Sequence, residues 1–405
     1  MSSLGTIGGV LIFLLIHLIQ ETLGIRVPSV LTYTSTRMML AALTSLILCI
    51  FLGPRFIRKL YEMKIGQSIR KEECPLLGEL HSKKENTPTM GGILILFSML
   101  VSMFLWMDLT SPFTLILLLT TCGLGALGAM DDLKKIRKKN TKGLSAKKKL
   151  FAQISISGLI ALYLFYPPFT EFFHQGSWFV PPTAKDFITE GPVLSLSEYS
   201  SRVYIPFFKE PILFLGPAFA VLLTILVTTG SSNAVNLTDG LDGLAAGSLI
   251  MVAICISLIA FVSNNMDLAR YLNILYIEGS GEIAIYLSAF AGACLGFLWY
   301  NSHPAQVFMG DTGSLALGGI IGVCAVLLKR EFLLAIIGGI FVAEALSVIL
   351  QVGSYRLRNK KRIFLCAPLH HHFEYQGWHE TKVVTRFWII GLMLTIIGIA
   401  SLKFQ

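Results

Sequence analysis

Long apolar runs alternate with short polar segments along most of the chain. Each run is about 20 residues long, which is the length that a helix needs to cross the hydrocarbon of a bilayer. Because no water reaches the backbone there, each run must satisfy its own hydrogen bonds as a helix. The pattern predicts an all-α polytopic membrane protein with ten transmembrane helices in a single domain over residues 1–405. The predicted spans are 36–54, 91–108, 112–130, 149–166, 211–229, 241–262, 282–300, 314–328, 332–352 and 383–402.

Composition agrees with this pattern and excludes an ordinary soluble domain. Hydrophobic residues make up 54% of the chain and charged residues only 14%. Residues 1–22 are apolar but short for a span, and they lack the basic start and cleavage site of a signal peptide. We expect an interfacial or tilted helix there. The Pro-rich segment 167–210 is expected to be an extended extracytoplasmic loop.

The net charge of +9 is distributed in a way that favours a membrane over a nucleic acid. Lysines and arginines concentrate in 55–90 and 131–148, whereas the alternate loops carry few. The positive-inside rule therefore places both termini on the extracytoplasmic side. Most of these cations are expected to set the topology and to meet anionic lipid, and no nucleic-acid partner is expected.

This topology brings five polar clusters to the cytoplasmic face and predicts an active site there. They are "KKENTPTMGG" (83–92), "GAMDDLKKIRKKNTKGLSAKKKL" (128–150), "SSNAVNLTDGLDG" (231–243), "YNSHPAQVFMGDTGS" (300–314) and "APLHHHFEYQGWHE" (367–380).

Asp131 and Asp132 end the third predicted span, where the partial negative charge of the helix C-terminus disfavours two carboxylates. A cation is needed to offset them. One interpretation pairs them with the cations that follow, Lys134, Lys135 and Arg137. The other is a divalent ion, for which hard oxygen ligands favour Mg²⁺, with Asp311 as a third carboxylate.

The segment "SSNAVNLTDGLDG" has a similar character. If it is helical, Asn236, Asp239 and Asp242 share one face and could present an amide and two carboxylates to a ligand. A plain turn with capping aspartates is the alternative. An EF-hand is excluded because the series of ligands ending in glutamate is absent. Near Asp311, glycines would let the backbone approach a phosphate, and Thr312 and Ser314 could cap the next helix.

His370, His371 and His372 cannot converge on one ion if they are helical, because consecutive side chains then point about 100° apart. Phosphate binding or proton transfer suits them better, and a surface histidine run is the alternative. Lys84, Lys135 and Lys149 could balance phosphate charge, and Phe308 could stack on a planar ring.

Together these motifs resemble the polyprenyl-phosphate N-acetylhexosamine-1-phosphate transferases, over nearly the whole chain and in the same order. The resemblance implies a Mg²⁺-dependent transfer of phospho-MurNAc-pentapeptide from UDP-MurNAc-pentapeptide to undecaprenyl phosphate. Lipid I and UMP would form at the cytoplasmic face of the bacterial inner membrane, as a step in peptidoglycan synthesis. It also implies a homodimer. The segment 168–200 departs from the family pattern, and any partner on the outer side is left open.

The resemblance also implies roles for individual residues. The metal would be held by Asp311, with Asp239, Asp131 and Asp132 beside it. The catalytic residues would be Asp131, Asp132, Asp311, His370 and His371. The substrate-binding residues would be Lys84, Thr89, Lys135, Lys149, Asn236, Asp239, Gly240, Asp242, Asn301, Phe308, Gln351 and His372. The ninth span would be broken and would send an amphipathic helix over 353–365 into the bilayer.

Two alternatives remain open from the sequence. A sibling transferase that uses UDP-N-acetylglucosamine would share the chemistry. A secondary transporter would explain carboxylates near membrane helices, but its acids should lie at mid-bilayer in related broken helices. Here the acids cluster at loop mouths on one side, which favours the transferase.

Overall fold

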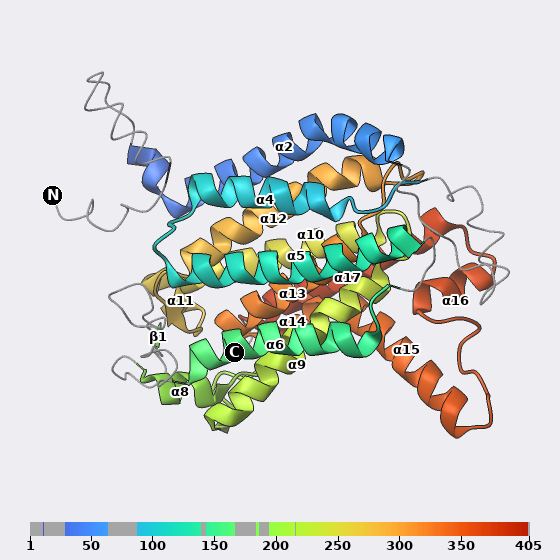
Figure 1. The fold of residues 1–405 in the computed structure, drawn as a ribbon. Coiled ribbons are helices and arrows are strands. Elements are labelled where there is room, and N and C mark those ends of the chain that lie inside the picture. The colour runs from blue at the N-terminus through green and yellow to red at the C-terminus, as the bar shows by residue number, and fades with distance from the viewer. Residues whose placement is uncertain are drawn as a thin grey trace, which may run out of the picture.

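The computed structural model describes residues 11, 29–63, 87–138, 143–166, 184–185, 194–214 and 216–403 (Figure 1). The 3₁₀ helix η1 spans Ser29–Thr32. The α-helices are α2 (Thr34–Glu62), α4 (Gly92–Trp106), α5 (Pro112–Lys138), α6 (Ala146–Phe165), α8 (Leu196–Ser201), α9 (Pro217–Thr238), α10 (Leu244–Ser263), α11 (Met266–Tyr271), α12 (Gly281–Asn301), α13 (Gly310–Leu327), α14 (Glu331–Ile337), α15 (Gly339–Leu357), α16 (Leu369–Tyr375) and α17 (Glu380–Ser401). The strands are β1 (Ala184–Lys185), β2 (Arg202–Val203), β3 (Leu213–Phe214) and β4 (Tyr276–Ile277).

The fold is nearly all-α, as predicted, and the chain is a multi-pass membrane protein. Nine helices in the described ranges are long and apolar enough to cross a bilayer. The predicted span 91–108 corresponds to α4, which is apolar but has only 15 residues. The strands form two short antiparallel pairs, β1 with β4 and β2 with β3. Part of the segment predicted as an extended outer loop is therefore ordered, because α8, β1 and β2 lie in it. The predicted helix over 1–22 lies almost entirely outside the described residues.

Helix α13 is the centre of the bundle, with 89% of its most apolar window buried. It packs against α9 and α5, and it also contacts α4 and α10. Small residues make this burial compatible with close helix contacts, since Gly318 and Gly322 lie directly against Ser231 and Thr228 of α9. A larger side chain at either glycine would separate the two helices.

Helix α9 extends further than the hydrophobic pattern predicted. The fifth span was expected to end at 229, but α9 continues to Thr238. Its last two turns carry polar residues that bond to neighbouring helices: the Ser232 hydroxyl donates to the Leu315 carbonyl at 2.8 Å, and the Asn233 amide donates to Gln153 at 2.9 Å. Polar side chains that are satisfied in this way are compatible with a buried helix.

The ninth span is broken, as expected, but the break lies at Gly338 between α14 and α15. The prediction of an amphipathic helix over 353–365 is wrong. Helix α15 runs without interruption to Leu357, and the chain then turns back in an irregular segment toward α16 (Figure 1).

A buried ion pair joins α2 to α12 at the start of α12. Arg37 lies 2.8 Å from Glu282 and also donates to the Trp106 carbonyl at 2.7 Å. The Glu282 carboxylate accepts the backbone N–H of Asp108 at 2.9 Å as well. Because both charges are paired and hydrogen-bonded, their burial is tolerated.

The contact between Gly128 of α5 and Asp311 of α13 sets the distance between these two helices. A Cβ at position 128 would overlap the backbone carbonyl of Asp311. We therefore expect Gly128→Ala to destabilise the fold by about 1–3 kcal/mol, through overpacking against backbone that cannot move aside. Thermal unfolding in detergent measures this loss. Gly230→Ala in α9 is the matched control, because a Cβ there meets nothing within 4 Å. Equal melting temperatures for the two variants would contradict the expectation.

Candidate active site

Three carboxylates meet where α5 ends and α13 begins. Asp131 and Asp132 lie near the C-terminus of α5 and are 0% and 3% exposed. Asp311 lies in the first turn of α13, because that helix begins at Gly310 and not at 314 as predicted. Ligand oxygens of the three acids all lie within 4.8 Å of one another. The sequence prediction that Asp311 joins the aspartate pair is therefore confirmed geometrically.

Two lysines bridge these acids, and we call the five residues together the acid–lysine cluster. Lys135 lies 2.8 Å from the Asp131 carboxylate and 3.0 Å from that of Asp311. Lys149, from α6, lies 3.0 Å from Asp131 and 2.5 Å from Asp311. The local pairing with Lys135 is thus real, but it is part of a larger network that three helices share. Three acids against two lysines leave the cluster with one negative charge in excess.

Asp132 is bonded mainly to the start of α13. Its carboxylate accepts the Asp311 N–H at 3.2 Å, the Thr312 N–H at 2.9 Å and the Thr312 hydroxyl at 2.7 Å. The prediction that Thr312 caps its own helix is therefore wrong. An acid from α5 takes that place, where the helix dipole favours negative charge.

Backbone and amide donors orient the two other acids. The Leu144 N–H donates to Asp131 at 2.5 Å, and the Asn236 amide donates to Asp311 at 3.0 Å and to the Ser314 hydroxyl at 2.8 Å. Asn236 thus brings the end of α9 to the cluster, as expected.

Asp239 follows the end of α9 and lies beside the same cluster. Burial, the largest cause, and the nearby carboxylates of Asp311 and Asp132 together raise the pKa of Asp239 to about 7. A hydrogen bond from the Gly310 backbone opposes this shift. The side chain therefore changes its charge near neutral pH, and a bound cation would favour its ionised form.

The cluster fits a divalent cation by its chemistry. Its acidic donors are all carboxylate oxygens, which hard cations prefer, and its excess charge is negative. Asp131, Asp132 and Asp311 could hold such an ion, with Asp239 close by.

Asp242 belongs to a second group, separate from the acid–lysine cluster. Its carboxylate lies 3.1 Å from His303 Nδ1 and accepts the Ala305 N–H at 3.1 Å. Glu380 lies 3.5 Å from the same imidazole nitrogen and accepts the Asp242 N–H at 2.8 Å. The hypothesis of one helical face for Asn236, Asp239 and Asp242 is wrong, because α9 ends at Thr238 and the chain then turns.

Asn301 and Gln351 use their amides to hold backbone. Asn301 accepts the Gly243 N–H at 3.1 Å and donates to the Val307 carbonyl at 2.8 Å. Gln351 accepts the N–H groups of Ile363 and Phe364 and donates to the Phe364 carbonyl. Both residues therefore shape the loops on which other candidates lie.

Phe308 and Thr89 lie where two of the motifs meet. The Phe308 N–H donates to the Pro88 carbonyl, and its own carbonyl accepts the Gly91 N–H, both at 2.8 Å. This pairing joins "TPTMGG" to "FMGDTGS". Thr89 lies against Gly310, next to the Asp132 carboxylate. Lys84 lies outside the described residues.

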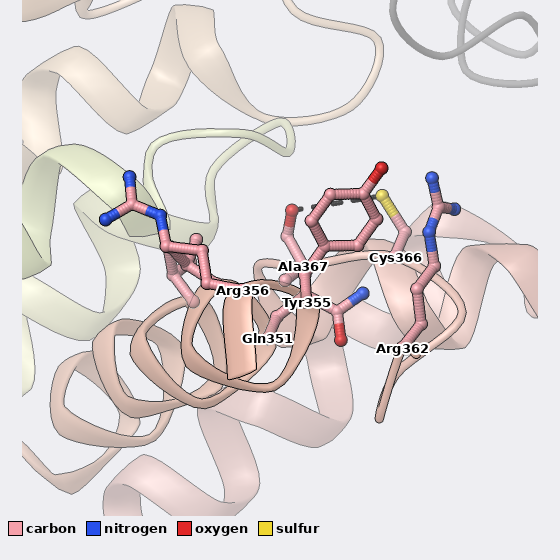
Figure 2. A pocket seen from close by; sticks show the side chains of 8 residues that line it. Gln351, Tyr355, Arg356, Arg362, Cys366 and Ala367 are labelled. Atoms are coloured by element: carbon pink, nitrogen blue, oxygen red, sulfur yellow. Dashed lines mark hydrogen bonds between the residues drawn. The ribbon is translucent and has the colours of Figure 1, made fainter. Parts of the chain in front are cut away.

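A hollow of about 430 Å³ lies between the end of α15 and the segment that turns back from it (Figure 2). Its lining residues are Val348, Gln351, Val352, Tyr355, Arg356, Arg362, Cys366 and Ala367. The two arginines make it cationic, which distinguishes it from the acid–lysine cluster.

The three histidines have different polar neighbours. His370 is fully buried, and its Nδ1 lies 3.1 Å from Glu344. His371 Nδ1 lies 2.7 Å from Glu374, and His372 Nδ1 accepts the Leu365 N–H at 3.1 Å. Gly240 lies directly against His370 Nε2, so the histidine segment reaches the loop after α9.

The sequence reasoning gave no role to Glu344, His303 or Glu380. His303 and Glu380 stand inside motifs that it had singled out. Glu344 carried the clearest signal that was overlooked, since it is a single acid in an apolar span, and ionisable groups at such positions are usually functional.

Comparison with known proteins agrees with this architecture. Residues 114–329, which run from α5 to the end of α13, match glycosyl transferase family 4. The chain belongs to this family of transferases.

Within this family, the chain is most informatively compared with the phospho-N-acetylmuramoyl-pentapeptide-transferases. Residues 84–96 match the phospho-N-acetylmuramoyl-pentapeptide-transferase signature 1. The chain is 65% identical to the phospho-N-acetylmuramoyl-pentapeptide-transferase of Protochlamydia amoebophila, over 98% of this chain and 100% of the relative. It is 47% identical to that of Desulfotalea psychrophila, over 93% of this chain and 96% of the relative.

Proposed function

We propose that this protein transfers phospho-MurNAc-pentapeptide from UDP-MurNAc-pentapeptide to undecaprenyl phosphate and releases UMP. The observation that carries the proposal is the acid–lysine cluster, in which Asp131, Asp311 and two lysines meet at the ends of membrane helices. The similarity to named phospho-N-acetylmuramoyl-pentapeptide-transferases supports this substrate pair.

The net reaction is a phosphoryl transfer. An oxygen of undecaprenyl phosphate forms a bond to the sugar-bearing phosphorus of the nucleotide, and the bridging oxygen leaves with UMP. A lipid-bound phosphate stays at the headgroup layer, so a site at helix ends is where it can meet a soluble substrate. Such a reaction is accelerated chiefly by positioning and by charge stabilisation.

Each part of the cluster has a role in this scheme. Asp131, Asp132 and Asp311 would hold Mg²⁺, with Asp239 close by, and the ion when bound would offset the negative charge that develops on the leaving phosphate. Lys135 and Lys149 already lie at the carboxylates and can reach an incoming phosphate oxygen. Asp132 also keeps the start of α13 in place, through its hydrogen bond from the Thr312 N–H. The loop after α9, with Asp239 and Gly240, and the segment with Phe308 would receive the nucleotide.

The site is proposed to face the cytoplasm in the bacterial inner membrane, with ten spans and both termini outside. The basic segments 55–90 and 131–148 support this orientation. A cytoplasmic face is also where a nucleotide-linked sugar is available.

A direct assay tests the proposal. Purified protein in detergent is incubated with UDP-MurNAc-pentapeptide, undecaprenyl phosphate and Mg²⁺, and UMP release is measured. A parallel reaction contains UDP-N-acetylglucosamine instead. We expect UMP and a lipid-linked product only with the pentapeptide substrate. UMP from the second nucleotide alone would identify a sibling transferase, and UMP from neither would refute the proposal.

A further inference from the structure

Glu344 is a carboxylate inside an apolar helix with no exposure at all. It lies in α15, and its relative accessibility is 0%. An isolated carboxylate at such a position is costly unless it has a charged or hydrogen-bonding partner. The position of that partner therefore indicates what the carboxylate is for.

The partner is His370, at the start of α16. The imidazole Nδ1 lies 3.1 Å from Glu344 Oε1. The His370 backbone N–H points at the same carboxylate, 3.2 Å from Oε1 and 3.4 Å from Oε2. Within the described ranges, the Glu344 carboxylate has no other polar contact. One buried acid thus accepts the backbone N–H of His370 and lies at ion-pair distance from its ring.

The opposite edge of the ring faces the candidate active site. His370 Nε2 lies so close to Gly240 that a Cβ there would overlap it. Both ring nitrogens are buried and neither makes a hydrogen bond to the described residues, so Nδ1 meets Glu344 at ion-pair distance only. Gly240 follows Asp239, which lies beside the acid–lysine cluster. The ring therefore lies between a buried acid at its Nδ1 edge and the loop after α9 at its Nε2 edge.

We infer that Glu344 is a positioning residue that acts through His370. The negative charge of the carboxylate, 3.1 Å from Nδ1, favours a proton on that nitrogen, so that Nε2 is the nitrogen presented at the loop after α9. It also stabilises the protonated ring, whose Nε2–H then donates a hydrogen bond to an anionic oxygen of the nucleotide-sugar diphosphate. A carboxylate that fixes the tautomer and charge of a functional histidine is a recurring arrangement in enzyme sites. This inference rests on the proposed function, since it assumes a diphosphate substrate at this loop.

A double-mutant cycle on the full-length protein tests the inference. Glu344→Gln removes the charge but keeps the size, and His370→Gln removes the ring. We expect Glu344→Gln to lower kcat/KM for UDP-MurNAc-pentapeptide by about 10–100-fold, the loss typical of such supporting groups. The double variant should lose no more than His370→Gln alone, because Glu344 has nothing to act on once the ring is absent. Glu344→Asp, which keeps the charge, should recover part of the loss.

Two results would overturn the inference. One is a Glu344→Gln enzyme within about threefold of the unaltered kcat/KM, and the other is a double variant whose loss is the product of the two single losses. If Glu344→Gln does not fold, the cycle is run with Glu344→Asp and judged by the second result alone, whether its loss multiplies with that of His370→Gln. Glu282→Gln is the matched control, since Glu282 is also a buried acid with a cationic partner but lies at the far end of α12. Its effect should multiply with that of His370→Gln. Failure of the proposed function would appear separately, as no UMP release by the unaltered protein.

Discussion

Asp311→Asn should lower the rate of UMP release by about 10²–10³-fold, the effect of removing one group that stabilises charge in the reaction. Asp311 is the only member of the cluster whose carboxylate contacts both lysines and is also partly open, at 13% exposure. The asparagine keeps the shape and the hydrogen bonding with Asn236 but removes the charge. Steady-state kinetics with saturating substrates measures the loss.

The control for this variant is Asp267→Asn, which alters an exposed acid in the first turn of α11. It should leave kcat unchanged. Thermal unfolding of both variants should stay near that of the unaltered protein, because the amide at 311 replaces the carboxylate without a change in volume. If Asp311→Asn retained near-full activity, the acid–lysine cluster would be a structural ion network, and the proposed site would lie elsewhere.

Removal of divalent cations should reduce UMP release to background, a loss of at least about 100-fold, and added Mg²⁺ should restore it. The physical reason is the negative excess of the cluster: two lysines cannot neutralise three carboxylates and a diphosphate together. Activity is measured in excess chelator and then along a Mg²⁺ titration.

The same titration in Asp131→Asn should require a higher Mg²⁺ concentration for half-maximal activity, because one ligand charge is lost. Glu282→Gln is the control, because it removes a buried charge and keeps the length of the side chain. It should leave the Mg²⁺ concentration for half-maximal activity unchanged. Full activity in chelator would contradict a catalytic divalent cation and assign charge neutralisation to the lysines alone.

Hydrophobic run length was sufficient to predict the membrane helices. Every predicted span overlaps a helix, and the aspartate pair, Asp311 and Asn236 were correctly expected to meet. This worked because a bilayer imposes one length and one secondary structure on every segment that crosses it. Sidedness and the homodimer stay predictions.

The end of α9 shows where run length fails. Ser232 and Asn233 were assigned to a loop because they are polar, but their hydrogen-bonding partners are supplied by α13 and α6. Where a helix ends depends on hydrogen-bonding partners from distant parts of the chain. The hydrophobic periodicity of a segment carries no information about those partners. The position of the break in the ninth span, at Gly338, and the continuation of α15 to Leu357 were missed for the same reason.

The residues that support the site could not be predicted from the local sequence pattern either. Glu344 and His370 are 26 positions apart, and only the fold shows that they are in contact. The amide of Gln351 holds the backbone of residues 363 and 364, which the sequence did not indicate, and its assignment to the substrate stays a prediction. A polar residue near a site is predicted from sequence, but whether it faces the ligand or the scaffold is decided by packing.

The contact between Gly128 and Asp311 affects which sequence changes related proteins can tolerate. The geometry of the cluster depends on two helix faces that touch without side chains between them, so one added methyl group at position 128 would push α5 and α13 apart even in a chain that keeps every acid and every lysine. A search of related sequences that scores only the charged residues would not detect such a change. The glycine on α5 is as informative about retained chemistry as the acids that it brings together.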